Sequence, residues 1–535
     1  MTTEKKIHEQ STSWLRSAKA VGVITLLSRI TGLARESVQA ALLGTTPMAD
    51  AFRVAFLLPN LLRRLVGEGA VQSGFVPVFS AWVARENRES IRIFAEKCFT
   101  LWTVLLALVT LVGIGLSGLL LAPILVASSE GEWSVEQSVL TSRLTQALFV
   151  YVIFIGLSAL AQGVLHGFKV FALPATTPLL FNLCFIVAGL VFPLFFDNRP
   201  DFAAWSFVVG ILVGGVLQFA VLIPALWKRG IRFVPRRPRG HPGMREIARL
   251  LVPATIGAGV YQINVMVSVF IATATGEGAV SALSYSGRLM EVVLGVYVFA
   301  LSTVSLTTLS QQADAGDLAG FRMTASEVLR LVAFITIPST VGLFILGDQI
   351  IRLVFNWGRF QEQAIDLTFA AFRFHILGLF LVSFSRVLVT QFYAFKNVWT
   401  PVRLAGLNLV LHAVLCYMLS RTDLGHAGVA LASTVSVGVH CLLLWVTFQR
   451  WKGLIDGRSV AVCVGRSTIA AAVMGAACWG GTYLLPADSS KWVLGGFVAV
   501  EVLGGAGLYF ATARVLGAPE LSVLLARRPS TDRRS

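Results

Sequence analysis

The sequence predicts an all-α integral membrane protein with about fourteen membrane-spanning helices. Of its 535 residues, 56% are hydrophobic and only 13% are charged, whereas a soluble domain carries roughly 25% charged residues. The mean hydropathy is +0.75. A spanning helix needs about 20 mostly apolar residues, and residues 101–126, 202–226 and 492–511 each provide such a run. These observations exclude a water-soluble fold.

Apolar runs separated by short polar breaks give the order of the helices. The first seven predicted helices cover residues 18–43, 48–82, 93–127, 138–167, 172–196, 203–228 and 246–274. The next seven cover residues 279–311, 322–347, 363–395, 399–420, 426–450, 460–485 and 491–517. Because the number of helices is even, both termini are expected on the same side of the membrane.

The distribution of basic residues predicts which side that is. The net charge is +16, and its largest cluster follows the sixth helix, in residues 228–249. Short loops rich in Lys and Arg stay in the cytoplasm, so both termini are predicted to be cytoplasmic. The clustering in loops argues against nucleic acid as a partner. The first apolar stretch is interrupted at Ser28 and Arg29 and has no small-residue cleavage site, so no cleavable signal peptide is expected.

A short repeat suggests two related halves. Phe168-Lys169 followed by Pro174 recurs, 227 residues later, as Phe395-Lys396 followed by Pro401. Six helices separate the copies, which favours parallel repeats, although chance similarity of one short motif is the alternative. The predicted organisation is an N-terminal lobe (residues 1–230), a C-terminal lobe (231–452) and a final helix pair with a basic tail (453–535).

Charged residues inside the predicted helices are the strongest candidates for function. They are Arg29, Arg35, Glu36, Asp50, Arg53, Arg63, Arg64, Glu68, Arg288 and Glu291. An arginine at the bilayer centre costs about 2.5–3.5 kcal/mol, so these side chains should face protein, a water-filled cavity or a ligand. Pairs three or four residues apart, such as Arg64 with Glu68, Asp50 with Arg53 and Arg288 with Glu291, are also compatible with a purely structural role.

An excess of buried arginine suits a phosphorylated ligand. Arginine stays charged and its forked donors match phosphate oxygens, so Arg29, Arg63 and Arg288 predict a site for a diphosphate or another lipid-linked anion. The six cysteines and the isolated histidines of the apolar helices lack metal-ligand spacing and are interpreted as packing residues.

Four segments resemble the MurJ (MviN) lipid II flippase family. Two of them lie near the N-terminus and read SRITGLARESVQAALLG (28–44) and DAFRVAFLLPNLLRRLVGEGAVQSGFVPVFS (50–80). Two later ones read SYSGRLMEVVLGV (284–296) and FYAFKNVWTPVR (392–403). The resemblance implies the fold of the multidrug/oligosaccharidyl-lipid/polysaccharide exporter superfamily, with two six-helix lobes around a central cavity and two extra C-terminal helices.

The resemblance also implies roles for individual residues. Substrate binding is expected of Arg29, Arg35, Arg63 and Arg288, gating or salt bridges of Asp50, Arg64, Glu68 and Glu291, and weak sodium candidates are Asn264 and Asn408. Three positions depart from the family pattern: Leu57 replaces a common lysine, Glu36 a common aspartate and Gly287 an aspartate that often precedes the arginine. The last departure weakens the idea that a neighbouring residue holds Arg288.

The implied function is movement of the polyprenyl-diphosphate-linked peptidoglycan precursor from the cytoplasmic to the periplasmic leaflet by alternating access. A monomer in the bacterial cytoplasmic membrane, surrounded by membrane lipids, is expected to do this without enzymatic chemistry or a cofactor. No GxxxxGK[ST] phosphate loop occurs, so coupling to sodium, protons or the membrane potential is expected. The alternatives are a related exporter of drugs or other lipid-linked oligosaccharides, which usually has twelve helices, a membrane enzyme acting on polyprenyl-linked sugars, and a scaffold.

Overall fold

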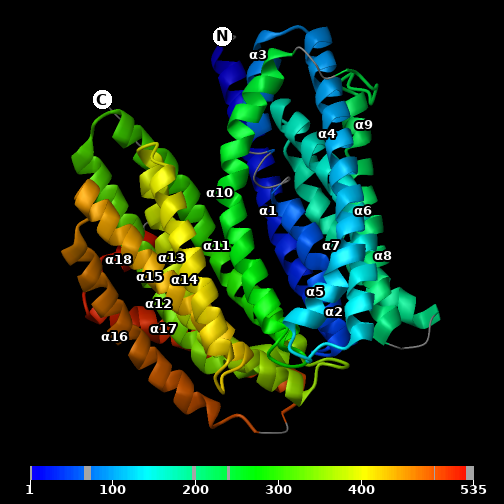
Figure 1. Ribbon diagram of the computed structural model, residues 1–535. Helices are drawn as coiled ribbons and strands as arrows, with labels where there is room; N and C mark the ends of the chain where they lie inside the picture. The colour runs from blue at the N-terminus through cyan, green and yellow to red at the C-terminus, as the bar shows by residue number, and fades with distance from the viewer. Residues whose placement is uncertain are drawn as a thin grey trace, which may run out of the picture. The chain divides into compact units, whose positions relative to one another are not determined.

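The computed structural model describes residues 3–65, 71, 74–195, 200–237, 241–486 and 489–525, and its regular elements are helices (Figure 1). The chain forms two compact units. The first contains Met1–Ser281 and Trp357–Gln361, and the second contains Ala282–Asn356 and Glu362–Ser535.

The helices follow the predicted order closely. In the first unit they are α1 (Thr3–Leu43), α2 (Pro47–Arg63), α3 (Val76–Arg85), α4 (Arg88–Leu116), the π-helix η2 (Ser117–Leu121), α5 (Ala122–Ser128), α6 (Val135–Gly167), α7 (Ala172–Phe195), α8 (Pro200–Ala220), α9 (Ile223–Trp227) and α10 (Pro242–Ala272). Helix α11 (Ala279–Asp314) begins there and continues into the second unit. The second unit adds α12 (Leu318–Phe355), α13 (Glu362–Ala394), α14 (Trp399–Ser420), α15 (His426–Trp451), α16 (Gly457–Thr482), α17 (Lys491–Val515) and α18 (Glu520–Leu525).

The first predicted helix begins earlier than expected, because α1 starts at Thr3 and not at residue 18. Three other predicted helices are interrupted. The expected second helix is interrupted: α2 ends at Arg63, the described residues among 64–75 are π-helical, and α3 begins at Val76 next to Pro77. The third is divided by η2, just before Pro123. The sixth is divided into α8 and α9, with Pro224 in the first turn of α9. In each case a proline, which lacks a backbone N–H, opens the following segment.

Ten helices or helix pairs of the described residues are long and apolar enough to cross a membrane. They correspond to α4 with α5, α6, α7, α8 with α9, and the six helices α12 to α17. The remaining predicted spans fall on α1, α2 with α3, α10 and α11, each of which carries charged residues. The protein is therefore a multi-pass, helical membrane protein.

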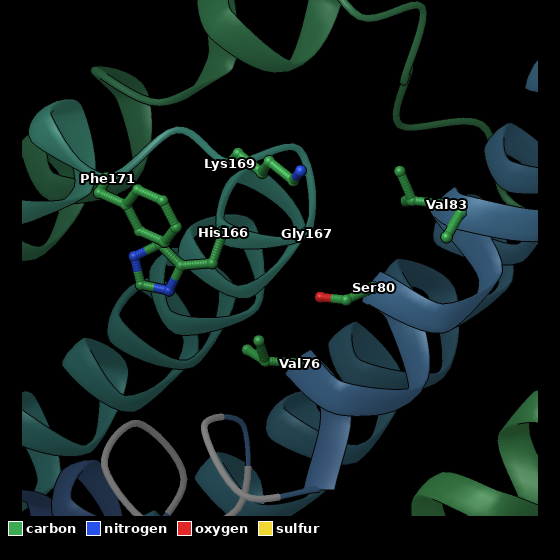
Figure 2. A pocket seen from close by; sticks show the side chains of 8 residues that line it. Val76, Ser80, Val83, His166, Gly167, Lys169 and Phe171 are labelled. Carbon is green, nitrogen blue, oxygen red and sulfur yellow. The ribbon is translucent and has the colours of Figure 1, made fainter. Parts of the chain in front are cut away.

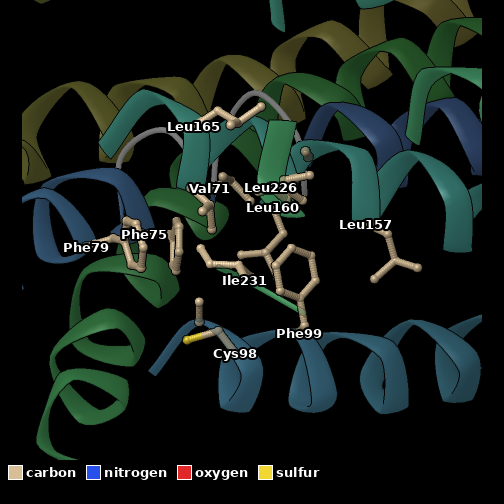
Figure 3. Close-up of a cluster of buried hydrophobic side chains, with 14 of the residues drawn as sticks. Val71, Phe75, Phe79, Cys98, Phe99, Leu157, Leu160, Leu165, Leu226 and Ile231 are labelled. Carbon is tan, nitrogen blue, oxygen red and sulfur yellow. The ribbon is translucent and has the colours of Figure 1, made fainter. Parts of the chain in front are cut away.

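Helix α6 forms the centre of the first unit. It packs against α2, α4 and α8, while α1 packs against α7. One apolar cluster of this unit joins α3, α4, α6 and α9 through side chains such as Phe79, Phe99 and Leu160 (Figure 3). A second cluster joins α2, α6, α7 and α8 around Phe52, Tyr151 and Phe207.

The second unit is built on α12 and α13. Helix α12 packs against α13, α16 and α17, and α15 packs against α13 and α14. Two apolar clusters among its described residues are centred on Phe321, Phe392 and Phe448, and on Phe334 and Tyr509. The phenol of Tyr509 donates a hydrogen bond of 2.7 Å to the carbonyl of Phe334, which satisfies its buried polar atom.

The local structure supports the predicted repeat. Helices α6 and α13 both have 33 residues, and the repeated Phe-Lys pair follows directly after each. Lys169 and Lys396 both adopt a left-handed conformation with φ of 59°. In each copy the lysine N–H bonds three residues back and the next N–H bonds five residues back, at 2.8–3.0 Å. Both helices thus end with the same Schellman-type motif. A chance similarity of the two short sequences would not require the same backbone conformation at both turns.

Candidate functional site

A buried ionic network joins α1, α2 and α7 in the first unit. Glu36 accepts a hydrogen bond of 2.6 Å from Arg35 and one of 2.8 Å from Arg53. The Glu36 side chain is only 4% exposed. Arg35 also donates to the side-chain carbonyl of Asn182 on α7 at 3.3 Å and lies over the ring of Phe185. The local pairing of Asp50 with Arg53 is not what the structure uses: the ion pair of Arg53 is with Glu36.

The other predicted arginines of the first unit have different surroundings. Arg29 is exposed on α1, less than two turns before Arg35. Arg63, at the end of α2, donates 2.9 Å from Nε to the side chain of Asn60, one turn earlier. Arg64 follows in the π-helical segment, and its Nε is buried. Glu68, the expected partner of Arg64, lies outside the described residues.

Among the predicted charges that the structure describes, Asp50 is the most completely buried, with 1% exposure. Its two carboxylate oxygens accept hydrogen bonds from the backbone N–H groups of Gly278 and Ser281, both at 2.8 Å. These groups open helix α11, whose first N–H groups have no partner within the helix. Asp50 therefore acts as a helix cap supplied by a distant part of the chain, 228 residues away from Gly278.

Three chain segments close around this cap. Near the end of α1, the carbonyl of Ala41 accepts a hydrogen bond of 2.8 Å from the backbone N–H of Arg359. Gly44 and Gly278 both have positive φ, and a side chain on either would collide with the backbone oxygens of Arg359 and Thr45 respectively. Sequence reasoning missed Arg359, since its bond comes from the backbone. The sequence feature that could have pointed to this segment is the glycine at position 358, which also has positive φ.

In the second unit, Arg288 pairs with Glu291 as the spacing predicted. The two are joined at 2.7 Å and their side chains are 31% and 39% exposed. Two residues earlier on the same helix, Ser286 shares a hydrogen bond of 2.7 Å with Nδ1 of His375 on α13. Sequence reasoning interpreted His375 as a packing residue, and this contact gives it a specific role in holding α13 to the start of α11.

The weak sodium candidates share one property. The side-chain oxygens of Asn264 on α10 and Asn408 on α14 are buried and accept no hydrogen bond from the described residues. Asn408 is 8% exposed and lies one turn before His412, which contacts Ser436 at 3.3 Å. Within the described residues no group of three His, Cys, Asp or Glu side chains could hold a metal ion.

A cavity of about 750 Å³ lies between α3 and the turn that joins α6 to α7 (Figure 2). Ser80 and Val76 of α3 point into it opposite His166 and Phe171 (Figure 2). Its wall is mostly carbon, and Lys169 adds a positive charge to the lining. The predicted site residues lie elsewhere in the chain, so this cavity is separate from the arginine clusters.

The arginines and carboxylates of the membrane helices are typical of a membrane protein that binds an anion. Arginines that are buried or half-buried there, and partly neutralised by carboxylates, can bind an anion without covalent chemistry. The fold agrees with that of solved transporters. A multidrug resistance MATE family transporter of the MOP superfamily in an inward-facing conformation has a TM-score of 0.68 at 14% identity, over 82% of this chain and 98% of that one. The molecule therefore has the fold of this transporter superfamily.

The sequence comparisons identify the family. The model of the lipid II flippase MurJ family matches residues 39–502. The lipid II flippase MurJ of Burkholderia cenocepacia is 34% identical over 441 residues, which are 81% of this chain and 84% of that protein. A probable lipid II flippase MurJ of Treponema pallidum is 32% identical over 455 residues, 83% of this chain and 84% of its own. A solved MurJ in an inward closed conformation has a TM-score of 0.75 at 23% identity, over 92% of this chain and 98% of that one.

The chain belongs to the MurJ family of lipid II flippases. The expected resemblance and fold class are therefore confirmed, and the alternative of a related drug or oligosaccharide exporter is not favoured.

Proposed function

We propose that this protein moves lipid II, the polyprenyl-diphosphate-linked peptidoglycan precursor, from the cytoplasmic to the periplasmic leaflet of a bacterial cytoplasmic membrane. The single observation that carries the proposal is the family match over residues 39–502. The arginines inside the membrane helices support it, because their guanidinium groups match the oxygens of a diphosphate. The protein acts as a monomer with both termini in the cytoplasm, in keeping with the basic loop at residues 228–249.

The substrate is held through its charged headgroup. Arg29, Arg63 and Arg288 contact the diphosphate, and Arg35 supports them from the buried network with Glu36. Because Glu36 forms ion pairs with both Arg35 and Arg53, these two arginines serve mainly to position α1 and α2. No covalent bond is made or broken, and the polyprenyl tail remains in lipid.

Release to the periplasm requires the contacts at the start of α11 to rearrange. Asp50 holds α2 to α11 through two backbone hydrogen bonds, and hydrogen bonds to a charged group contribute about 1.5–3 kcal/mol each. Two hydrogen bonds of this strength can hold the protein in one conformation and can still break during each transport cycle. Arg64, Glu68 and Glu291 take part in salt bridges that change between the states.

Transport is driven by an ion gradient or the membrane potential. Moving one elementary charge across 100 mV is worth about 2.3 kcal/mol, which biases release of an anionic headgroup. Sodium is one candidate ion, supported by the unsatisfied buried oxygens of Asn264 and Asn408. Sodium bound at Asn408 should raise the melting temperature of the parent more than an equal concentration of potassium does. Asn408→Leu will abolish that difference.

Complementation tests the proposed function. The parent should restore growth of a strain depleted of its own lipid II flippase, and Arg29→Ala, Arg63→Ala and Arg288→Ala at matched expression should not. Arg450→Ala is the control, because Arg450 is exposed at the end of α15 and outside the site. Failure of a well-expressed parent in the membrane would contradict the proposal.

A further inference from the structure

A second cavity lies at the N-terminal end of α16, in the second unit. It has a volume of about 250 Å³ and is lined by residues of α12, α16 and the turn leading to α18. The charged side chains of the lining are Arg330, Arg458, Arg466, Asp456 and Glu520. Three arginines and two carboxylates leave one net positive charge, which a single phosphodiester would neutralise. None of these residues belongs to the site described above.

Each of the two lining carboxylates already has a polar contact within the protein. Asp456 caps α16 by accepting the N–H of Ser459 at 3.3 Å. Glu520 is 3% exposed, and one of its oxygens lies 3.6 Å from Nε of Arg330. Its other oxygen, Oε2, accepts no hydrogen bond from the described residues. A buried carboxylate oxygen without a donor is costly, so a ligand with a hydroxyl group would be favoured beside it.

Two of the lining arginines, Arg458 and Arg466, have donors that a ligand could use. Arg458 is exposed and makes no ion pair with the described residues. Arg466 donates 2.9 Å from one Nη to the carbonyl of Gly517, and its guanidinium has further donors. The two arginines are eight residues apart, about 12 Å along the helix, so their long side chains can reach a ligand placed between them.

The helix that carries these arginines continues as an apolar, exposed face. Val462, which lines the cavity, is followed on the same side of α16 by Ile469 and Val473, which are 55% and 43% exposed. Helix α16 has 26 residues, or about 39 Å, against roughly 30 Å of hydrocarbon in a bilayer. Its first turns therefore lie at headgroup depth and its middle at acyl-chain depth.

We infer that this cavity binds the headgroup of an anionic phospholipid, with the phosphate on Arg458 and Arg466, a headgroup hydroxyl on Glu520 and an acyl chain along Ile469 and Val473. The fitting headgroup is phosphoglycerol, because it supplies one negative charge and hydroxyl donors. The volume is below the roughly 300–1,000 Å³ of drug-sized pockets, which suits a headgroup with its chains outside. The assignment rests on the proposed function only for the leaflet, which is then the cytoplasmic one.

Native mass spectrometry of the full-length, delipidated protein with phosphatidylglycerol tests this inference without any transport step. The parent should retain one tightly bound phosphatidylglycerol, and Arg458→Gln/Arg466→Gln should weaken its binding at least about tenfold. Arg450→Gln, at the same end of the spans but outside the cavity, should bind as the parent does. Equal binding by the parent and the double variant would overturn the inference.

Two further probes separate the competing ligands. Phosphatidylethanolamine should bind about tenfold more weakly than phosphatidylglycerol, and equal binding would contradict an anionic headgroup. Inorganic phosphate at millimolar concentration should leave the lipid in place, and its displacement would show a soluble-anion site instead. If the double variant does not fold, Glu520→Gln decides: it should still bind phosphatidylglycerol but lose the preference over phosphatidylmethanol, whose headgroup has no hydroxyl. A preference retained in that variant would contradict the role of Glu520.

Discussion

At the scale of single residues, the charges inside the membrane helices divide into two groups. Glu36 and Asp50 are almost fully buried and have defined partners on other elements. Arg29, Arg288 and Glu291 remain partly or largely exposed. The sequence could identify all of these residues, because charges are costly in lipid. It could not assign partners, since Glu36 meets Arg53 across 17 residues and Asp50 meets Gly278 across 228.

The buried carboxylate of Glu36 yields a prediction about stability. Removing one partner of a buried ion pair costs about 3–5 kcal/mol, because the remaining charge is left uncompensated. Glu36→Gln should therefore destabilise the protein by roughly 3 kcal/mol, measured by denaturant unfolding in detergent. In a double-mutant cycle with Arg53→Gln, the combined loss should be smaller than the sum of the single losses. Strict additivity would argue that the pair does not form.

His241 yields a prediction about pH. Its ring stacks on Phe94 with centroids 4.3 Å apart, just before α10 begins. Burial, aided by the positive charge of Lys97, lowers the pKa of His241 below its ordinary value of 6.5. The unfolded chain then takes up a proton more readily than the folded one, so stability falls as the pH drops below 6.5. His241→Phe should reduce the loss of melting temperature between pH 7.5 and pH 5.5, and an unchanged loss would contradict this assignment.

At the scale of elements, most helix positions were predictable and the interruptions were not. Helices α13 and α14 begin within one residue of the predicted positions, because hydrophobicity alone marks such long apolar runs. The π-helical residues after Arg63 and in η2 carry no distinct hydrophobic period, so the pattern predicts continuous helices there. The short segment at residues 357–361 was missed for another reason: its hydrogen bond to the end of α1 comes from the backbone N–H of Arg359.

The cap on α11 yields a prediction for this element. In Asp50→Asn the side chain presents an N–H donor to one of the two backbone donors, so that hydrogen bond is lost. The loss should destabilise the protein by about 1.5–3 kcal/mol and impair transport, measured by thermal unfolding and by complementation. Thr46→Ala is a matched control, because Thr46 caps the start of α2 itself. If Asp50→Asn were no more harmful than Thr46→Ala, the tie between α2 and α11 would be of no special importance.

The repeated turn yields a second prediction for elements. Lys169 and Lys396 occupy left-handed positions that cost little for glycine and more for other residues. Lys169→Gly should raise stability by up to about 1 kcal/mol, whereas Lys169→Val should lower it by a similar or larger amount. The same pair of changes at Lys396 should act in the same direction, although Lys396 also pairs with Asp314 at 2.7 Å. Opposite signs at the two turns, measured by thermal unfolding, would contradict a structural repeat.

At the scale of the whole molecule, family membership and site chemistry point to one function. The family match covers residues 39–502, and the candidate arginines lie on α1, α2 and α11. The sequence motifs alone could reveal the family, because the segments 28–44, 50–80 and 284–296 contain the charged candidate residues of the membrane helices. The role of Asn408 in sodium binding stays a prediction, since amide oxygens have no distinctive spacing in the sequence.

Translocation in proteoliposomes gives the sharpest test of the proposed function. The purified parent should move fluorescent lipid II between leaflets, detected with a membrane-impermeant reagent, while Arg29→Ala, Arg63→Ala and Arg288→Ala should each slow this movement at least about tenfold. Arg450→Ala should match the parent. If the parent failed to move lipid II, or if the three variants moved it as fast as the parent, the proposed transport through an arginine-lined site would be contradicted.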